Sequence, residues 1–297
     1  MVPALFLFVS VVNDIRALVA AHDFAAADRE VREYQARQGS TPELATALSW
    51  LARGSLDARQ FDRADSYATE SRGIAGQLLK TRKLDADSWL PTAVGASIEV
   101  HAQVLAARGE RPEALEFLRL ELELFAGTSI AERIRKNVNL LSLEGKPAPP
   151  LVIRDWVGAT RPVPLSSLQG RPVLLFFWAH WCGDCKAEVA ILARIRKIFE
   201  PQGLAIVAPT RLYGYVAKGA DATPEVEKNY IEQVRHQYYS ELAGVAAPLS
   251  AGNFVAYGAS TTPTLVLIDA AGIVRMYHPG ALSESDLTAR IQTALKK

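Results

Sequence analysis

Cys182 and Cys185, the only two cysteines of the chain, are separated by Gly183 and Asp184. A thiolate at such a pair can attack the disulfide of another molecule, and the second cysteine can then resolve the mixed disulfide. Two cysteines exclude a multi-disulfide scaffold and a four-cysteine zinc site. A purely structural disulfide between such close residues would close too small a loop to add much stability. The spacing therefore predicts a redox-active dithiol that needs no metal and no cofactor.

The residues around this pair predict a strand, a turn and a helix. Residues 173–178 form an apolar run without period-two alternation, as expected of a central strand buried on both faces. A helical pattern follows at 185–199. Cys182 should lie at or just before the N-terminus of this helix, where free N–H groups and the helix dipole favour a thiolate. We therefore expect Cys182 to be the nucleophile and Cys185, buried one turn further in, to be the resolving cysteine.

The C-terminal half has the alternating pattern of an α/β domain. Short β-type runs at 173–178, 204–208 and 265–268 alternate with helical stretches at 185–199 and 225–242. The distinctive stretches are Gly145-Lys-Pro-Ala-Pro149, Leu165-Ser-Ser-Leu168-Gln-Gly170, Phe177-Trp178-Ala-His-Trp181-Cys182-Gly-Asp-Cys185, Tyr257-Gly258-Ala-Ser-Thr-Thr262-Pro263-Thr264 and Leu267-Ile268-Asp269-Ala-Ala-Gly272. With them, residues 145–297 resemble the thioredoxin-fold proteins of the TlpA/ResA type, which are exported thiol-disulfide oxidoreductases.

The resemblance implies roles for two residues far along the chain from the cysteines. Thr262-Pro263 falls where the family places a cis-proline loop beside the disulfide. There Pro263 would pack near the sulfurs, and the backbone of Thr262 would pair with a substrate strand. The alternative is a trans proline that simply opens the strand beginning at Thr264.

Glu188 follows Cys185 by three residues and matches an acidic residue that members of this family carry near the active site. Its implied role is to take or give the proton that Cys185 exchanges, with a pKa raised by partial burial. The alternative is an exposed helix residue that pairs with Lys186 or Arg194.

The other residues near the motif have less determined roles. Asp184 stands where the family commonly has proline, and its negative charge should raise the pKa of the Cys182 thiol and favour the disulfide, so we predict a reducing couple. Trp181 should shield the exposed sulfur of Cys182 and offer a contact surface to substrate, whereas Trp178 should belong to the core. His180 either stabilises the thiolate as a cation or only replaces a small residue in the turn.

The N-terminal half predicts an all-α domain. Residues 13–143 are rich in Ala, Leu, Arg and Glu, with apolar residues three and four apart. A short unit recurs at 21–27, 58–64 and 109–115, and it reads as the turn of a helical hairpin with Ala27, Ala64 or Ala114 opening the second helix. The units resemble tetratricopeptide hairpins, although their spacing is unequal. Such hairpins either present a groove to a protein partner or only pack against the rest of the chain.

Composition shifts suggest the domain boundaries. Residues 1–12 form an apolar run shorter than the roughly 18 residues of a membrane span, and we interpret it as a truncated export signal or as the first turn of a helix. Residues 144–150 are rich in structure-breaking residues and form a linker. This leaves 13–143 as a helical-hairpin domain and 151–297 as a thioredoxin-like domain. Within the latter, 209–253 is longer than the thioredoxin plan requires, and its tyrosines either contact a partner or seal a helix onto the sheet.

The sequence thus favours an exported, periplasmic or cell-envelope enzyme that reduces or exchanges protein disulfides. Its expected partners are protein disulfide substrates, a redox partner that recycles the dithiol, and a protein held by the helical domain. The net charge of +1 gives no field that would attract nucleic acid. The main alternative is an adaptor whose thioredoxin domain only docks. A copper chaperone usually has more widely spaced cysteines, and a peroxidase needs Thr and Arg near a single cysteine.

Overall fold

The computed structural model describes residues 10–296 and divides the chain into two compact units, 1–137 and 138–297. Most of the apolar run at 1–12 lies outside the described residues. Of its last residues, Val11 and Val12 begin the first helix and are buried. The proline-rich segment 144–150 belongs to the second unit. Among residues 10–296, no helix combines the length and the apolar character needed to cross a membrane.

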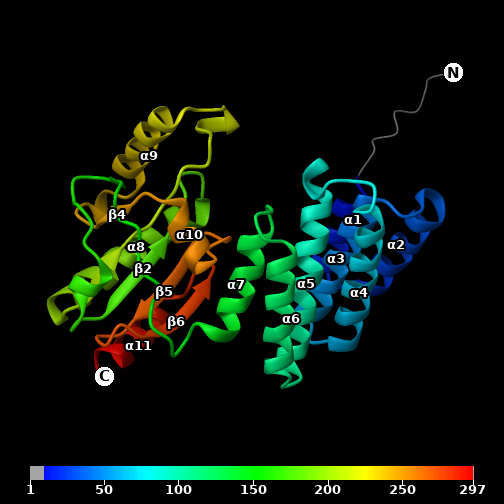
Figure 1. Ribbon diagram of the computed structural model, residues 1–297, viewed down its shortest axis with the longest axis horizontal. Coiled ribbons are helices and arrows are strands. Elements are labelled where there is room, and N and C mark those ends of the chain that lie inside the picture. Colours follow the sequence, from blue (N-terminus) through cyan, green and yellow to red (C-terminus); the bar gives the residue numbers. More distant parts are fainter. Residues whose placement is uncertain (1–9, 297) are drawn as a thin grey trace. The chain divides into compact units, whose positions relative to one another are not determined.

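The first unit is built of antiparallel helical hairpins (Figure 1). Its helices are α1 (Val11–Ala20), α2 (Phe24–Gln38), α3 (Pro42–Asp57), α4 (Phe61–Leu78), α5 (Trp89–Ala107), α6 (Arg111–Leu124) and the first part of α7 (Ala131–Ser142), with the short 3₁₀ helix η1 (Leu84–Ala86) before α5. Helices α3, α4 and α5 pack against one another and form the centre of the unit. The all-α prediction for this half is confirmed.

The recurring unit of the sequence is the turn of each hairpin. The middle residue of each turn adopts the left-handed conformation, with φ of 59° at His22, 59° at Arg59 and 89° at Gly109. In each turn the next residue donates its N–H to a carbonyl five residues earlier (Asp23 to Leu18, Gln60 to Ser55, Glu110 to Leu105). The alanine that follows on the second helix, at 27, 64 or 114, is completely buried. A small side chain there lets the paired helices approach closely.

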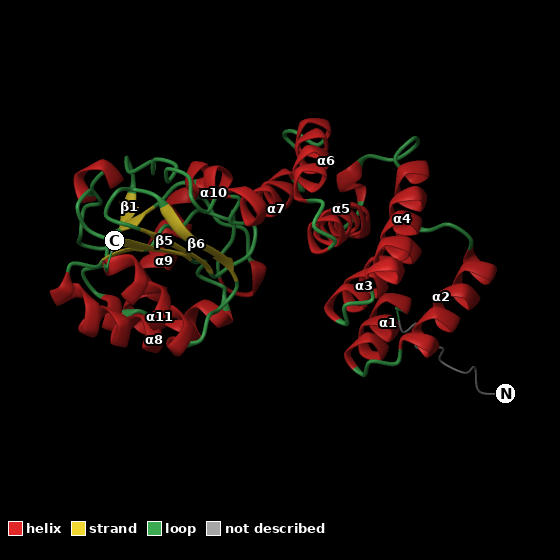
Figure 2. Cartoon of the chain, turned by 90° about the horizontal axis from the view of Figure 1, so that it is seen from below, coloured by secondary structure: helices red, strands yellow, loops and turns green. Residues whose placement is uncertain are grey.

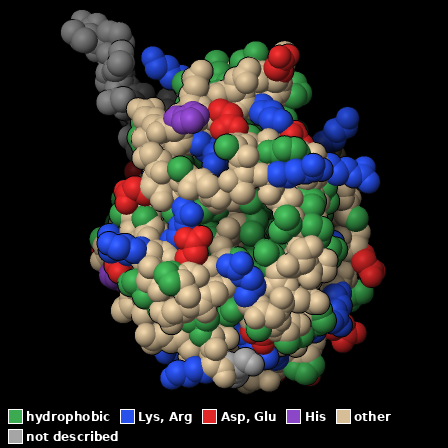
Figure 3. All heavy atoms as spheres, turned by 90° about the vertical axis from the view of Figure 1, so that its left-hand side faces the viewer, with side chains coloured by type: hydrophobic (Ala, Val, Ile, Leu, Met, Phe, Trp, Pro, Cys, Tyr) green, Lys and Arg blue, Asp and Glu red, His purple; other side chains and the backbone are tan. Residues whose placement is uncertain are grey.

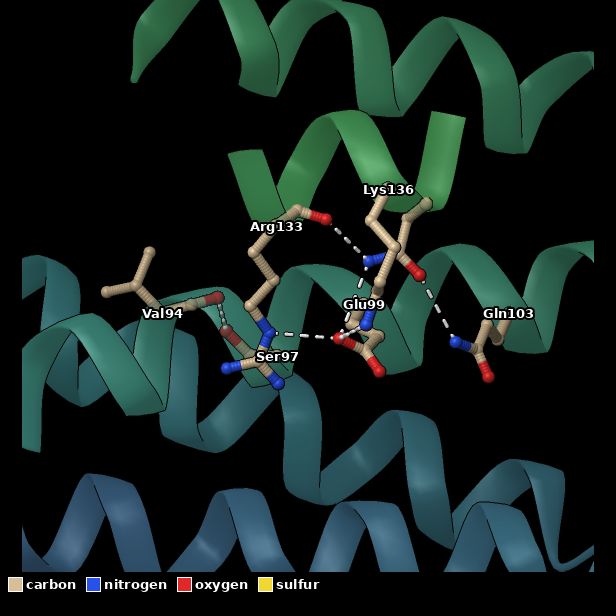
Figure 4. Close-up of polar contacts among 7 residues, drawn as sticks. Val94, Ser97, Glu99, Gln103, Arg133 and Lys136 are labelled. Atoms are coloured by element: carbon tan, nitrogen blue, oxygen red, sulfur yellow. Dashed lines mark hydrogen bonds and ion pairs between the residues drawn. The ribbon is translucent and has the colours of Figure 1, made fainter. Parts of the chain in front are cut away.

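A buried polar cluster joins α5 to the start of α7 (Figure 4). One carboxylate oxygen of Glu99 accepts from Arg133 Nε at 2.9 Å, Lys136 Nζ at 3.0 Å and Asn137 Nδ2 at 3.4 Å. The Glu99 side chain is only 17% exposed, so its charge is stabilised mainly by these donors. This cluster fixes the first part of α7 within the helical unit.

The second unit has the thioredoxin-like α/β fold that the resemblance implied. Its four-stranded sheet has the order β3-β2-β5-β6, in which β3 is parallel to β2 and the other neighbours are antiparallel. The strands are β2 (Val173–Phe177), β3 (Ala205–Val207), β5 (Thr264–Ile268) and β6 (Val274–Pro279), and a separate antiparallel pair consists of β1 (Trp156–Val157) and β4 (Ala247–Pro248).

Helices cover both faces of this sheet (Figure 2). They are α8 (Gly183–Phe199), α9 (Pro224–Tyr238), α10 (Ala251–Tyr257) and α11 (Glu284–Leu295), with the short 3₁₀ helices η2 (Leu165–Leu168), η3 (Glu200–Gln202), η4 (Ala217–Gly219) and η5 (Ser240–Leu242) between them. Side chains of α8, α9 and α11 pack on the face that carries Leu174 and Phe176, whereas α10 packs on the face that carries Val173, Leu175 and Phe177. Every residue of β2 is therefore buried, as its unbroken apolar pattern predicted.

Several element boundaries differ from the sequence expectation. The helix expected at 225–242 begins at Pro224, capped by Thr223, but ends at Tyr238 and is followed by η5. Strand β6 and the β1–β4 pair were not predicted. The pair is only two residues long on each side, and β6 alternates incompletely because the neighbouring residues Met276 and Tyr277 are both buried.

Replacement by alanine should change the free energy of unfolding in opposite directions at two glycines of the helical unit. A Cβ on Gly54 in α3 would overlap Val19 Cγ1 and lie 3.0 Å from Phe24 Cε1, whereas a Cβ on exposed Gly73 in α4 would meet nothing within 4 Å. We predict that Gly54→Ala lowers the free energy of unfolding by about 1–3 kcal/mol. Gly73→Ala should raise it by about 1 kcal/mol through helix propensity. Urea denaturation measures both, and equal effects would contradict the close packing of α1 against α3.

Candidate redox site

The cysteine pair lies at the junction between β2 and α8. The N–H of Cys182 donates to the carbonyl of Ala179 at 3.1 Å, which closes a turn with His180 and Trp181 as its central residues. Cys182 is the N-cap of α8, and Cys185 lies within its first turn. The predicted placement of Cys182 at the helix N-terminus is confirmed.

The two cysteines form a disulfide in this structure. The backbone N–H of Cys185 donates to Cys182 Sγ at 3.0 Å. After reduction of the disulfide, this N–H and the positive end of the helix dipole would stabilise negative charge on the Cys182 sulfur. Cys185 has no exposed surface, so access from solvent is restricted to Cys182.

Cys182 itself is more buried than the sequence suggested. The expectation of an exposed sulfur is wrong, because only 3% of the residue is accessible. Its sulfur lies 3.4 Å from the carbonyl oxygen of Thr262, which covers it from the loop before β5. Only a small part of Cys182 is therefore open to solvent.

The Thr262–Pro263 peptide bond is cis, as the resemblance implied, so the trans alternative is wrong. The carbonyl of Pro263 accepts from Gly280 N at 2.7 Å, and β5 begins at the next residue, Thr264. Among residues 10–296, buried Thr262 Oγ1 is one of the few side-chain polar atoms without a hydrogen-bond partner. The structure thus brings Thr262 and Cys182 together from positions 80 residues apart.

Glu188 is buried rather than exposed, so the alternative of a surface ion pair is wrong. The residue is 2% exposed, and Arg194 instead pairs with Glu284. Burial raises the pKa of Glu188 above its ordinary value, a hydrogen bond from the N–H of Leu282 opposes the rise, and the negative charge of Asp184 adds to it. This carboxyl therefore keeps its proton to a higher pH than an ordinary glutamate.

Trp178, just before the turn, and Trp181, within it, differ in environment. Trp178 is buried, donates from Nε1 to the carbonyl of Ala208 at 3.0 Å, and packs against Tyr239 at 4.5 Å between ring centroids. Trp181 is 49% exposed and meets the ring of Tyr213 edge to face at 5.5 Å. Of the tyrosines in residues 209–253, Tyr239 therefore packs against the core at the end of α9, whereas Tyr213 lies beside Trp181.

The sequence did not reveal the partner of His180. His180 and Glu227 are 1% and 0% exposed, and His180 Nε2 lies 3.1 Å from Glu227 Oε1. Burial lowers the pKa of His180, although the contact with Glu227 opposes this, so the cationic role is not favoured. The only local signal was the helix start at Thr223-Pro224-Glu225. Nothing in a local pattern could connect residues 47 positions apart.

The C-terminal part of the chain is similar to known redox proteins. Residues 145–211 match the AhpC/TSA family. Over 146 residues the chain is 32% identical to the thiol-disulfide oxidoreductase ResA of Bacillus subtilis, a match that covers 48% of this chain and 70% of ResA. Over 143 residues it is 31% identical to the thiol:disulfide interchange protein DsbE of Xylella fastidiosa, with 48% of this chain and 64% of DsbE covered. The chain thus spans less than two thirds of that DsbE.

A crystal structure of a DsbE-type thiol:disulfide interchange protein from Chlorobium tepidum superposes with a TM-score of 0.41 and 26% identity, over 51% of this chain and 97% of that chain. The sequence match to B. subtilis ResA covers 70% of that relative's length at 32% identity. On that match, the chain belongs to the ResA-type family of thiol-disulfide oxidoreductases.

Proposed function

We propose that this protein is an extracytoplasmic thiol-disulfide oxidoreductase that reduces or exchanges protein disulfides through Cys182 and Cys185. The observation that carries the proposal is the disulfide at the start of α8, in which Cys182 caps the helix and lies against Thr262 of the cis-proline loop. Membership of the ResA-type family supports the same chemistry. The extracytoplasmic location rests on the resemblance to exported proteins.

The reaction begins with the reduced pair. The Cys182 thiolate attacks one sulfur of the substrate disulfide, so that a bond between Cys182 and that sulfur forms while the substrate bond breaks. The departing substrate thiolate takes up a proton. Cys185 then loses its proton and attacks Cys182 Sγ, which restores the Cys182–Cys185 disulfide and releases the second substrate thiolate, again to be protonated. The protein dithiol is oxidised and the substrate disulfide is reduced; a redox partner must then return two electrons.

We assign to Glu188 the role of accepting the proton that Cys185 loses and of returning it. It lies on the same helix, three residues after Cys185, and both residues are buried. A carboxyl with a raised pKa holds a proton more readily than an ordinary glutamate, so it can accept the proton of Cys185 and return it. Thr262 and Trp181 are the proposed substrate contacts, because the first lies against Cys182 and the second is the exposed residue immediately before it.

Two features of the surface bear on the expected partners: the distribution of charge and a groove in the helical unit. Figure 3 shows basic and acidic side chains interspersed over one face of the molecule, so that face presents no field of one sign. In the helical unit, a groove of about 300 Å³ lies between α4 and α5 and is lined by Ala68, Thr69, Arg72, Gly73, Ser97 and His101. This groove is where a protein partner of the hairpins would bind, and it is the observation that favours the adaptor alternative.

Replacement of each cysteine tests the mechanism. Cys182→Ser should abolish exchange with a synthetic peptide closed by one internal disulfide, because the nucleophile is lost. Cys185→Ser should accumulate a mixed disulfide between Cys182 and the peptide, because the resolving thiol is lost. Mass spectrometry of acid-quenched reactions detects both outcomes. If both variants kept wild-type exchange rates, the mechanism would be wrong, and the adaptor alternative would take its place.

Replacement of Glu188 tests the proton transfer. Glu188→Gln keeps the size of the side chain but cannot exchange a proton, so resolution by Cys185 should slow by about 100-fold, the lower end of general acid–base effects.

The raised pKa of Glu188 also makes the wild-type protein lose stability as pH increases from the ordinary carboxyl range through that pKa, because the folded state then loses a proton that it holds more tightly than the unfolded state. Glu188→Gln should lack this loss.

Glu200→Gln is the matched control, since Glu200 lies at the end of the same helix and its side chain is 53% exposed. It should change neither the rate of resolution nor the pH dependence of unfolding. A Glu188→Gln variant with wild-type resolution across the pH range would exclude Glu188 from the proton transfer.

A further inference from the structure

Glu227 of α9 anchors the segment between β3 and α9, residues 208–223, which we call the inserted segment. Its side chain is completely buried. One carboxylate oxygen accepts from the N–H of Tyr213 at 2.6 Å and the other accepts from the N–H of Gly214 at 2.8 Å. Because these backbone groups can only donate, the Glu227 carboxyl acts as an acceptor toward both. The loop that follows β3 is thus tied to the first turn of α9.

The same carboxylate holds His180. The Nε2 atom of His180 lies 3.1 Å from Glu227 Oε1, the oxygen that also accepts from Tyr213. Three tyrosine rings surround the imidazole edge-on, with centroids at 5.6 Å for Tyr213, 5.5 Å for Tyr215 and 5.3 Å for Tyr230. This aromatic enclosure keeps water from the pair and fixes the plane of the imidazole.

The contact between His180 and Glu227 holds the turn that ends at Cys182. His180 and Trp181 are the two central residues of that turn, which the Cys182-to-Ala179 hydrogen bond closes. His180 is held through Glu227, and Trp181 is held against Tyr213, whose own N–H is bound to Glu227. Both central residues of the turn therefore depend on the inserted segment.

We propose that His180 and Glu227 are positioning residues that hold Trp181 and Tyr213 as one fixed aromatic surface beside Cys182, and that this surface selects disulfides flanked by polypeptide over small-molecule disulfides. Trp181 is 49% exposed, and the guanidinium of Arg211 lies 5.0 Å from the centroid of the Tyr213 ring. Aromatic rings and a guanidinium group bind apolar and aromatic side chains and peptide groups of an extended chain. A small disulfide has no such groups with which to use the surface.

This inference rests on the proposed function, and two substrates separate the two claims. The first probe is the synthetic peptide closed by one internal disulfide, and the second is bis(2-hydroxyethyl) disulfide. The protein is reduced beforehand and freed of reductant, so that each probe is the oxidant in a single turnover that takes two electrons from Cys182 and Cys185. The measured quantity is the ratio of kcat/KM for the peptide to kcat/KM for the small disulfide, each taken from the dependence of the single-turnover rate on probe concentration. A protein that reacts with neither probe would lack the proposed function, whereas a protein that reacts with both allows the ratio to be compared between variants.

Two variants change different parts of the arrangement. Glu227→Gln weakens the anchor, and Tyr213→Ala removes one ring while it leaves the backbone N–H that Glu227 accepts. Each should lower the ratio about 10-fold, mainly through the KM for the peptide, because fixed contacts to the flanking chain are lost. Glu225→Gln, at an exposed position in the same first turn of α9, should leave the ratio unchanged.

A merely structural role for the pair would slow both probes together and would not move the ratio. Unchanged ratios in both variants would therefore overturn the proposal. So would loss of both reactions in Glu227→Gln together with a wild-type ratio in Tyr213→Ala, because the inserted segment would then support the fold but not select the substrate.

Discussion

The backbone N–H of Cys185 donates to the sulfur of Cys182 at the first turn of α8, and the redox site is built around this contact. It requires that α8 begin shortly after β2 ends, with only residues 178–182 between them, and β2 is held in place because it is buried on both faces between α8 and α10. The antiparallel neighbour β5 then brings the cis-proline loop to the same place, since Phe177 of β2 is paired with Thr264 of β5. The sheet register and the helix start together bring the sulfur of Cys182 and the cis-proline loop to one place.

Around this contact the protein places two buried carboxyl groups in different environments. Glu188 has one weak backbone donor and a nearby negative charge, so burial raises its pKa and suits it to exchange a proton. Glu227 is satisfied by two backbone donors and by His180, so it serves as a fixed acceptor that joins the inserted segment to the turn. Glu188, on the helix that carries the cysteines, therefore has a single weak donor, whereas Glu227 joins two segments of the chain through its contacts.

Much of this site could be predicted from sequence, because its central part is local. The strand, the turn and the helix start are contiguous, and the hairpin turns of the helical unit repeat a short pattern whose backbone geometry is the same each time. The burial of Cys182 and the partner of His180 could not be predicted in this way. They depend on contacts 80 and 47 residues apart, and these are set by sheet register and by the path of the inserted segment. The short strands β1 and β4 were not predicted because a run of two residues has no periodicity to detect.

The central claim is that Cys182 and Cys185 form a cycling dithiol whose poise is set by the opposition between the helix N-terminus, which favours the thiolate, and Asp184, which disfavours it. The most direct test is an equilibrium titration of the pair in defined thiol buffers, read by alkylation and mass shift. A potential near or below about −270 mV, that of thioredoxin, is the predicted result and describes a reductant. A potential near about −120 mV would describe an oxidant and contradict the role of Asp184. A pair that does not cycle at all would contradict the proposed activity.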